Sequence, residues 1–193
     1  PKLSLEHRYT PVMDLIFMAL PVFAFLIVAE VVFTSLQGGG VYALKDFAGS
    51  MSQLGINSVV RLGTGGALIS LHFFLFQFRV FDVPNTVWGW IFTFVVIDFV
   101  FYWYHRAQHR VRFLWCAHVV HHSSEHMNLG TALRQSPTGP FTRALFYWPL
   151  PLLGFHPLLV ASAGAVATIY GFWTHTCLLY TSPSPRDIIG SRM

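Results

Sequence analysis

Residues 98–135 read DFVFYWYHRAQHRVRFLWCAHVVHHSSEHMNLGTALRQ and contain six of the ten histidines of this 193-residue chain. Five of the six form an HxxxH motif and an HxxHH motif, and these are His105, His109, His118, His121 and His122. On a helix, residues three and four positions apart lie on one face. Two such faces turned toward each other would form a cage of ring nitrogens. The spacing therefore predicts a metal site lined by histidine.

The composition indicates a membrane protein. Apolar residues make up 54% of the chain and charged residues only 10%, whereas soluble domains have about 25% charged residues. Lys and Arg exceed Asp and Glu by 12 to 8, but they are spread along the chain, which argues against a nucleic-acid partner. We expect an all-α, multi-span integral membrane bundle of helices.

Three apolar stretches are long enough to cross a bilayer, which requires about 20 residues. The predicted spans are Pro11–Leu36, 51–81 and 86–104, and the residues between the first two predict a loop with a short interfacial helix. Glu30 lies inside the first span, where a carboxylate is costly unless it has a partner. We therefore expect Glu30 to pair with another helix.

The predicted metal site lies at one end of the third span. Arg106, Arg110 and Arg112 follow this span closely, and basic residues beside a span favour the cytoplasmic side. Further along, residues 141–155 and 157–174 are apolar and joined at GFHP. They form either a re-entrant hairpin or one broken span.

The residue types narrow the choice of metal but do not identify it. With only two cysteines, the chain has no paired-cysteine zinc motif, so the ligands must be histidines. Neutral imidazole binds iron, zinc and copper.

Three segments of this region resemble the fatty acid hydroxylase/sterol desaturase superfamily of membrane histidine-box oxygenases: DFVFYWYHRAQH (98–109), HVVHHSSEHMN (118–128) and TALRQS (131–136). Within it they are most similar to the alkylglycerol monooxygenases and their bacterial relatives. The segment GFWTHT (171–176) resembles a later part of the same family, which implies His175 as a sixth ligand.

The resemblance implies an iron-dependent lipid monooxygenase or hydroxylase. Two non-haem irons would use O2 to attack a C–H bond of a lipid taken from the bilayer, with an ether lipid as the expected substrate. Tetrahydrobiopterin is a candidate reductant, and the electron donor is otherwise open. The expected location is the endoplasmic reticulum in a eukaryote or the inner membrane in a bacterium.

Four further residues are candidates for supporting the ligands. Asp98 stands seven residues before His105 and so on its helical face, and Glu125 closely follows the HxxHH motif. Asn128 and Arg134 match family positions. These two either contact a substrate headgroup or cofactor, or form caps and loop hydrogen bonds.

The chain divides into membrane spans (1–81), a histidine-box domain (82–176) and a terminal segment (177–193). Residues 177–187 read CLLYTSPSPRD and resemble a translated sequencing adapter, the alternative being a natural disordered Ser/Pro tail. We expect natural sequence to stop near Thr176. The family's last HxxHH box would then follow His175 in the parent protein, and the chain as written would be an inactive fragment.

Three other functions are compatible with the same residues. A sterol or fatty-acyl hydroxylase or desaturase would share the histidine boxes and differ in its lipid pocket. A membrane protein could also bind a metal or haem without catalysis. Finally, a degenerate membrane fragment would bind nothing.

Overall fold

The computed structural model describes residues 11–38 and 42–176, and no strand occurs among them. The helical elements along this part of the chain are α2 (Pro11–Leu36), α3 (Leu44–Phe76), α4 (Val87–Arg110), α5 (Arg112–His118), the 3-10 turn η1 (His121–Ser123), α6 (Leu129–Ala132), α7 (Gly139–Tyr147), α8 (Pro149–Leu152) and α9 (Pro157–Trp173). The predicted all-α class is confirmed. The segment expected to be non-native, 177–193, lies outside the described residues.

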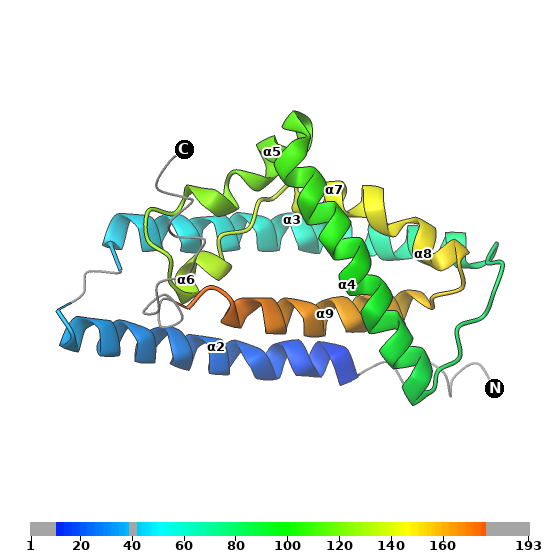
Figure 1. Cartoon of the computed structure of the whole chain (residues 1–193), viewed down its shortest axis with the longest axis horizontal. Helices are drawn as coiled ribbons and strands as arrows, with labels where there is room; N and C mark the ends of the chain where they lie inside the picture. Colours follow the sequence, from blue (N-terminus) through cyan, green and yellow to red (C-terminus); the bar gives the residue numbers. More distant parts are fainter. Residues whose placement is uncertain (1–10, 39–41, 177–193) are drawn as a thin grey trace.

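Helices α2, α3 and α9 run along the long axis of the molecule, and α4 crosses them at an angle (Figure 1). Helix α9 packs against α2, α3 and α4, so it lies at the centre of the bundle. The short helices α5 and α6 follow the end of α4 and pack against α4 and α3 respectively. The histidine region is therefore held between the ends of the long helices.

Three helices are long and apolar enough to cross a membrane: Met18–Leu36 within α2, Leu44–Phe76 and Val87–Arg110. Large apolar side chains on these helices point outward, as Phe25 (70% exposed) and Leu62 (85% exposed) do. Apolar surface of this kind is stable only against lipid or other protein. The chain is accordingly an integral membrane protein.

Two apolar cores hold the bundle together. The first lies between α4, α8 and α9 and includes Ile97, Leu150 and Ala163, which are almost fully buried. The second joins α2, α6 and α9 through Ile27, Leu129 and Phe172. This second core fixes the end of α9 that leads to His175.

The boundaries of α3 differ from the prediction. The helix starts at Leu44, inside the predicted loop, and ends at Phe76. Asp46 lies in its first turn, where a negative charge stabilises the helix by interacting with the positive end of the helix dipole. After α3, residues 80–83 pair with the chain before α9, with Val80 N–H donating to the Leu152 carbonyl at 2.8 Å.

The GFHP joint is a turn that depends on glycine. Gly154 has a φ of +96°, and a Cβ there would overlap the carbonyl oxygen of Phe81. His156 caps α9 by accepting a hydrogen bond from Leu158 N–H. The region of the undecided hairpin consists of two short helices, α7 and α8, followed by the 17-residue α9.

Candidate metal centre

Four histidines converge at the end of α4, and their ligand nitrogens all lie within 4.8 Å of one another: His105, His109, His118 and His122. His105 and His109 occupy the last turns of α4, four residues apart, and their Nε2 atoms are 3.0 Å apart. The Nε2 atoms of His118 and His122 are also 3.0 Å apart. We call these residues the four-histidine cluster.

The cluster forms because the chain bends sharply after α4. Val111 is the only residue between α4 and α5, and its extended backbone (φ −104°, ψ 116°) folds α5 back against α4. The ring of His118 thereby comes to 4.8 Å from the rings of His105 and His109, measured between centroids. Trp115 stacks on His122 at 5.8 Å and covers one side of the cluster.

The HxxHH motif does not form one helical face, which differs from the expectation. Helix α5 ends at His118, and His121 and His122 lie in the 3-10 turn η1. His122 joins the cluster, whereas the Nε2 of His121 lies 3.0 Å from the Nε2 of His175. We call His121 and His175 the histidine pair.

The pair has the hydrogen bonds of metal ligands. His121 Nδ1 lies 3.1 Å from the Arg134 carbonyl, and His175 Nδ1 lies 2.8 Å from the Gly171 carbonyl. A carbonyl can only accept, so each Nδ1 carries the proton and each neutral ring presents a bare Nε2. Two bare nitrogens facing each other at 3.0 Å repel unless a cation lies between or beside them. The histidine pair therefore fits a metal ion.

Burial holds four of the histidines outside the membrane helices in the neutral form. Burial, followed by the charge of neighbouring histidines, lowers the pKa of His118 to about 3. Burial and His175 lower the pKa of His121 to about 4. Burial also lowers the pKa of His122 and His175. Since only neutral imidazole binds a metal, these rings are ready to coordinate at neutral pH.

The four candidate supporting residues differ in their exposure and in the groups that they contact. Asp98 is exposed and lines a surface groove together with His105 and His109, and no hydrogen bond to a histidine is found for it within residues 42–176. Glu125 is exposed. Asn128 caps α6 by accepting a hydrogen bond from Thr131 N–H. Arg134 is buried and contacts His121 through its carbonyl.

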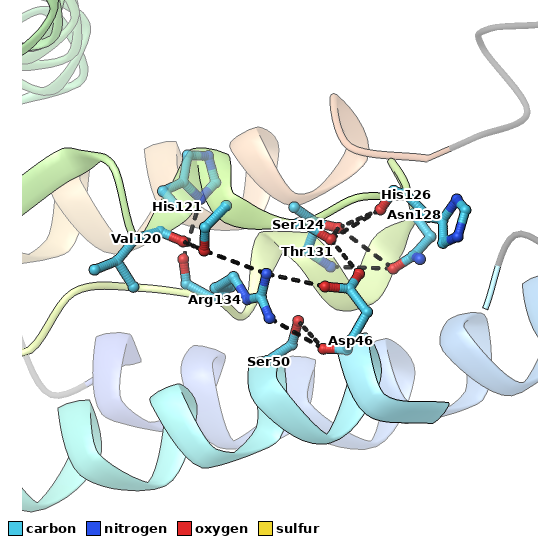
Figure 2. A network of polar contacts seen from close by, with 10 residues as sticks. Asp46, Ser50, Val120, His121, Ser124, His126, Asn128, Thr131 and Arg134 are labelled. Carbon is cyan, nitrogen blue, oxygen red and sulfur yellow. Dashed lines mark hydrogen bonds and ion pairs between the residues drawn. The ribbon is translucent and has the colours of Figure 1, made fainter. Parts of the chain in front are cut away.

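Two acidic residues support this region from the membrane helices (Figure 2 shows the first). Asp46 of α3 forms an ion pair with Arg134 at 3.0 Å, which the sequence did not indicate because the partners are 88 residues apart. Glu30 of α2 accepts hydrogen bonds from Leu129 N–H at 2.8 Å and Thr176 Oγ1 at 2.7 Å. The expectation that Glu30 pairs with another helix is confirmed, because Leu129 is the first residue of α6.

A family model described as fatty acid hydroxylase matches residues 90–192. The alkylglycerol monooxygenase of Danio rerio is 36% identical over 164 residues, which cover 83% of this chain and 36% of that protein. The Homo sapiens alkylglycerol monooxygenase is 34% identical over 166 residues, covering 84% and 37%. The Xenopus tropicalis protein of that name is 30% identical over 159 residues, covering 81% and 35%.

The chain therefore spans a little over a third of the length of these curated relatives. No solved structure matches it significantly. The family match covers more than half of the chain and includes all six histidines of the cluster and the pair. The chain belongs to the fatty acid hydroxylase family.

Proposed function

We propose that this chain is the histidine-box part of a membrane di-iron oxygenase that hydroxylates an ether lipid, as an alkylglycerol monooxygenase would. The observation that carries the proposal is the division of six histidines into two adjacent groups, the four-histidine cluster and the histidine pair. The rings of His121 and His122, one from each group, are 5.3 Å apart. The names of the relatives supply the substrate class.

In this proposal each group holds one iron. Iron, when bound, supplies the redox chemistry by which O2 attacks an unactivated C–H bond. The protein's part is to keep the ring nitrogens unprotonated and fixed. The carbonyls of Arg134 and Gly171 orient the histidine pair, and the ring of Trp115 lies against His109 and His122 and covers one side of the cluster.

The surface of α4 next to the cluster suits a lipid that arrives from the bilayer. A groove beside His105 and His109 is lined by Phe101 and Tyr102, both more than 40% exposed. An alkyl chain in this groove would lie against aromatic rings and end beside the ligands. Arg106, which lines the same groove, is placed to contact a polar headgroup.

The reaction requires two electrons and two protons besides the substrate and O2. Hydroxylation of the carbon next to the ether oxygen gives a hemiacetal, and one atom of O2 leaves as water. The hemiacetal then separates into an aldehyde and a glycerol. We propose tetrahydrobiopterin as the reductant, and the endoplasmic reticulum of a eukaryote or the inner membrane of a bacterium as the location.

The test uses the full-length protein, purified in detergent. The purified protein is analysed for iron and assayed for O2-dependent release of aldehyde from an alkylglycerol with reduced tetrahydrobiopterin. We expect His121→Ala and His122→Ala to abolish aldehyde release, and His126→Ala, outside both groups, to retain it. Normal activity in the first two variants would refute the proposal. Hydroxylated or desaturated sterol or fatty-acyl products would instead identify a sterol or fatty-acyl hydroxylase or desaturase.

A further inference from the structure

We propose that the ion pair between Asp46 and Arg134 positions His121, so that α3 controls the histidine pair although it contributes none of the six histidines. The inference rests on the metal site proposed above. Figure 2 shows the network, in which Arg134 lies between Asp46 on one side and His121 on the other.

The side chain of Arg134 is fixed on α3. Its Nη1 lies 3.0 Å from Asp46 Oδ1, and its Nη2 donates to the Asp46 carbonyl at 3.2 Å. Both side chains are about 10% exposed. Asp46 Oδ2 also accepts a hydrogen bond of 2.5 Å from Ser124 Oγ. A paired, mostly buried carboxylate and guanidinium with several hydrogen bonds have one preferred geometry.

The main chain of Arg134 holds the ligand. Its carbonyl oxygen accepts the Nδ1–H of His121 at 3.1 Å, and its Nη1 donates to Ser123 Oγ at 3.3 Å, two residues after His121. The ring of a metal-bound histidine takes its direction from the acceptor of its second nitrogen. Displacing Arg134 would therefore rotate the His121 Nε2 away from His175.

The packing of α3 also reserves space for this arginine. A Cβ added at Gly49 would overlap Nη2 of Arg134, whereas a Cβ at Gly55, on the same helix, would meet nothing within 4 Å. Both glycines lie inside α3, where alanine is the better helix former. The pair Gly49→Ala and Gly55→Ala thus separates displacement of the guanidinium from any general effect on the helix.

A purely structural ion pair makes a different prediction. If Asp46 and Arg134 only attached α3 to the loop after α6, their loss would lower the unfolding temperature and leave metal binding at the pair unchanged. A positioning role requires weaker binding at the histidine pair with an unchanged four-histidine cluster. Loss of such an outer hydrogen-bond partner weakens metal binding by about 10 to 100-fold.

The experiment titrates the detergent-purified protein with Co²⁺ and follows the visible absorption of the bound ion, the Co²⁺ content after dialysis, and the unfolding temperature. His175→Ala, which removes one ligand of the pair, identifies the part of the signal that belongs to the pair. We expect Asp46→Asn and Gly49→Ala to weaken Co²⁺ binding at the histidine pair by about 10 to 100-fold. Gly55→Ala and Asp82→Asn should leave it unchanged, the latter because Asp82 pairs with Arg79 on the surface.

The outcomes distinguish the two proposals. If His175→Ala binds Co²⁺ as the unaltered protein does, the histidine pair is not a metal site and both proposals fail. If the pair binds Co²⁺ and Gly49→Ala binds it with unchanged affinity and spectrum, only the positioning role is overturned. Gly49→Ala decides the question even where Asp46→Asn does not fold.

Discussion

Replacing Glu30 by alanine tests how far the first membrane helix stabilises the histidine region. The Glu30 side chain is 3% exposed and accepts hydrogen bonds from Tyr42 Oη at 2.5 Å, Leu129 N–H at 2.8 Å and Thr176 Oγ1 at 2.7 Å. The donors come from the loop before α3, from α6, and from the residue after His175. One carboxylate thus joins three separate segments.

The magnitude follows from these contacts. A hydrogen bond to a charged group contributes about 1.5–3 kcal/mol, and a buried donor left without an acceptor costs about 1–3 kcal/mol. Leu129 is 3% exposed, so its N–H would lose its acceptor out of reach of water. We expect Glu30→Ala to lower the free energy of unfolding by about 3–5 kcal/mol, less than the sum of three such hydrogen bonds because the desolvation cost of the buried carboxylate is removed with it. In a chain of this size the unfolding temperature would fall by about 6 to 20 °C.

Two further variants isolate the cause. Glu30→Gln keeps an oxygen for Leu129 and Tyr42 and offers an amide to the Thr176 hydroxyl, so we expect a loss of about 1 kcal/mol. Thr34→Ala is the matched control, because Thr34 is also buried on α2 but bonds only carbonyls of its own helix. Thermal unfolding in detergent measures all three. An unfolding temperature for Glu30→Ala equal to that of Thr34→Ala would refute the reasoning.

Gly154→Ala should destabilise the fold by about 2 kcal/mol or more, measured by thermal unfolding, because φ is +96° and the new Cβ overlaps a backbone oxygen. Gly164→Ala is the control, since this glycine lies inside α9 with open space around it, and it should be neutral or stabilising in the same assay. The metal-free protein should unfold at a lower temperature at pH 5 than at pH 7.5. The pKa values of His118 (about 3) and His121 (about 4) lie below the value of about 6.5 in the unfolded chain. Below a pH of about 6.5 the unfolded chain therefore binds protons that the folded chain does not, which favours unfolding. A higher unfolding temperature at pH 5 would contradict this. Finally, His118→Ala should lower the iron content of the purified protein, with His126→Ala as the control that retains it.

The long helices could be predicted because their signal is local. An apolar run of the required length defines α2, whose bounds are those expected, and α4, which starts one residue after the expected span and continues six residues beyond it, to Arg110. The start of α3 could not be predicted in this way. Its first turn carries Lys45 and Asp46, which suggest a loop in isolation, and the helix is stabilised there by Arg134 from a distant part of the chain.

In the candidate site, too, the features that depend on local sequence could be predicted, and those that depend on distant contacts could not. The four residues of the cluster lie in one short stretch, and their spacing alone indicates that they converge. The position of His121 depends on three long-range contacts, with Arg134, with His175 and, through Arg134, with Asp46. Helical periodicity assigns His121 to the same face as His118, and these tertiary contacts decide otherwise.

The separation of the two histidine groups along the chain sets the order in which they can form. The four-histidine cluster is complete once residue 122 has been made, and it requires only the short reversal at Val111. His121 and His175 are 54 residues apart, so bringing them together closes a much longer loop after α9 has been synthesised. A chain still on the ribosome can therefore bring the four-histidine cluster together before His175 has been made.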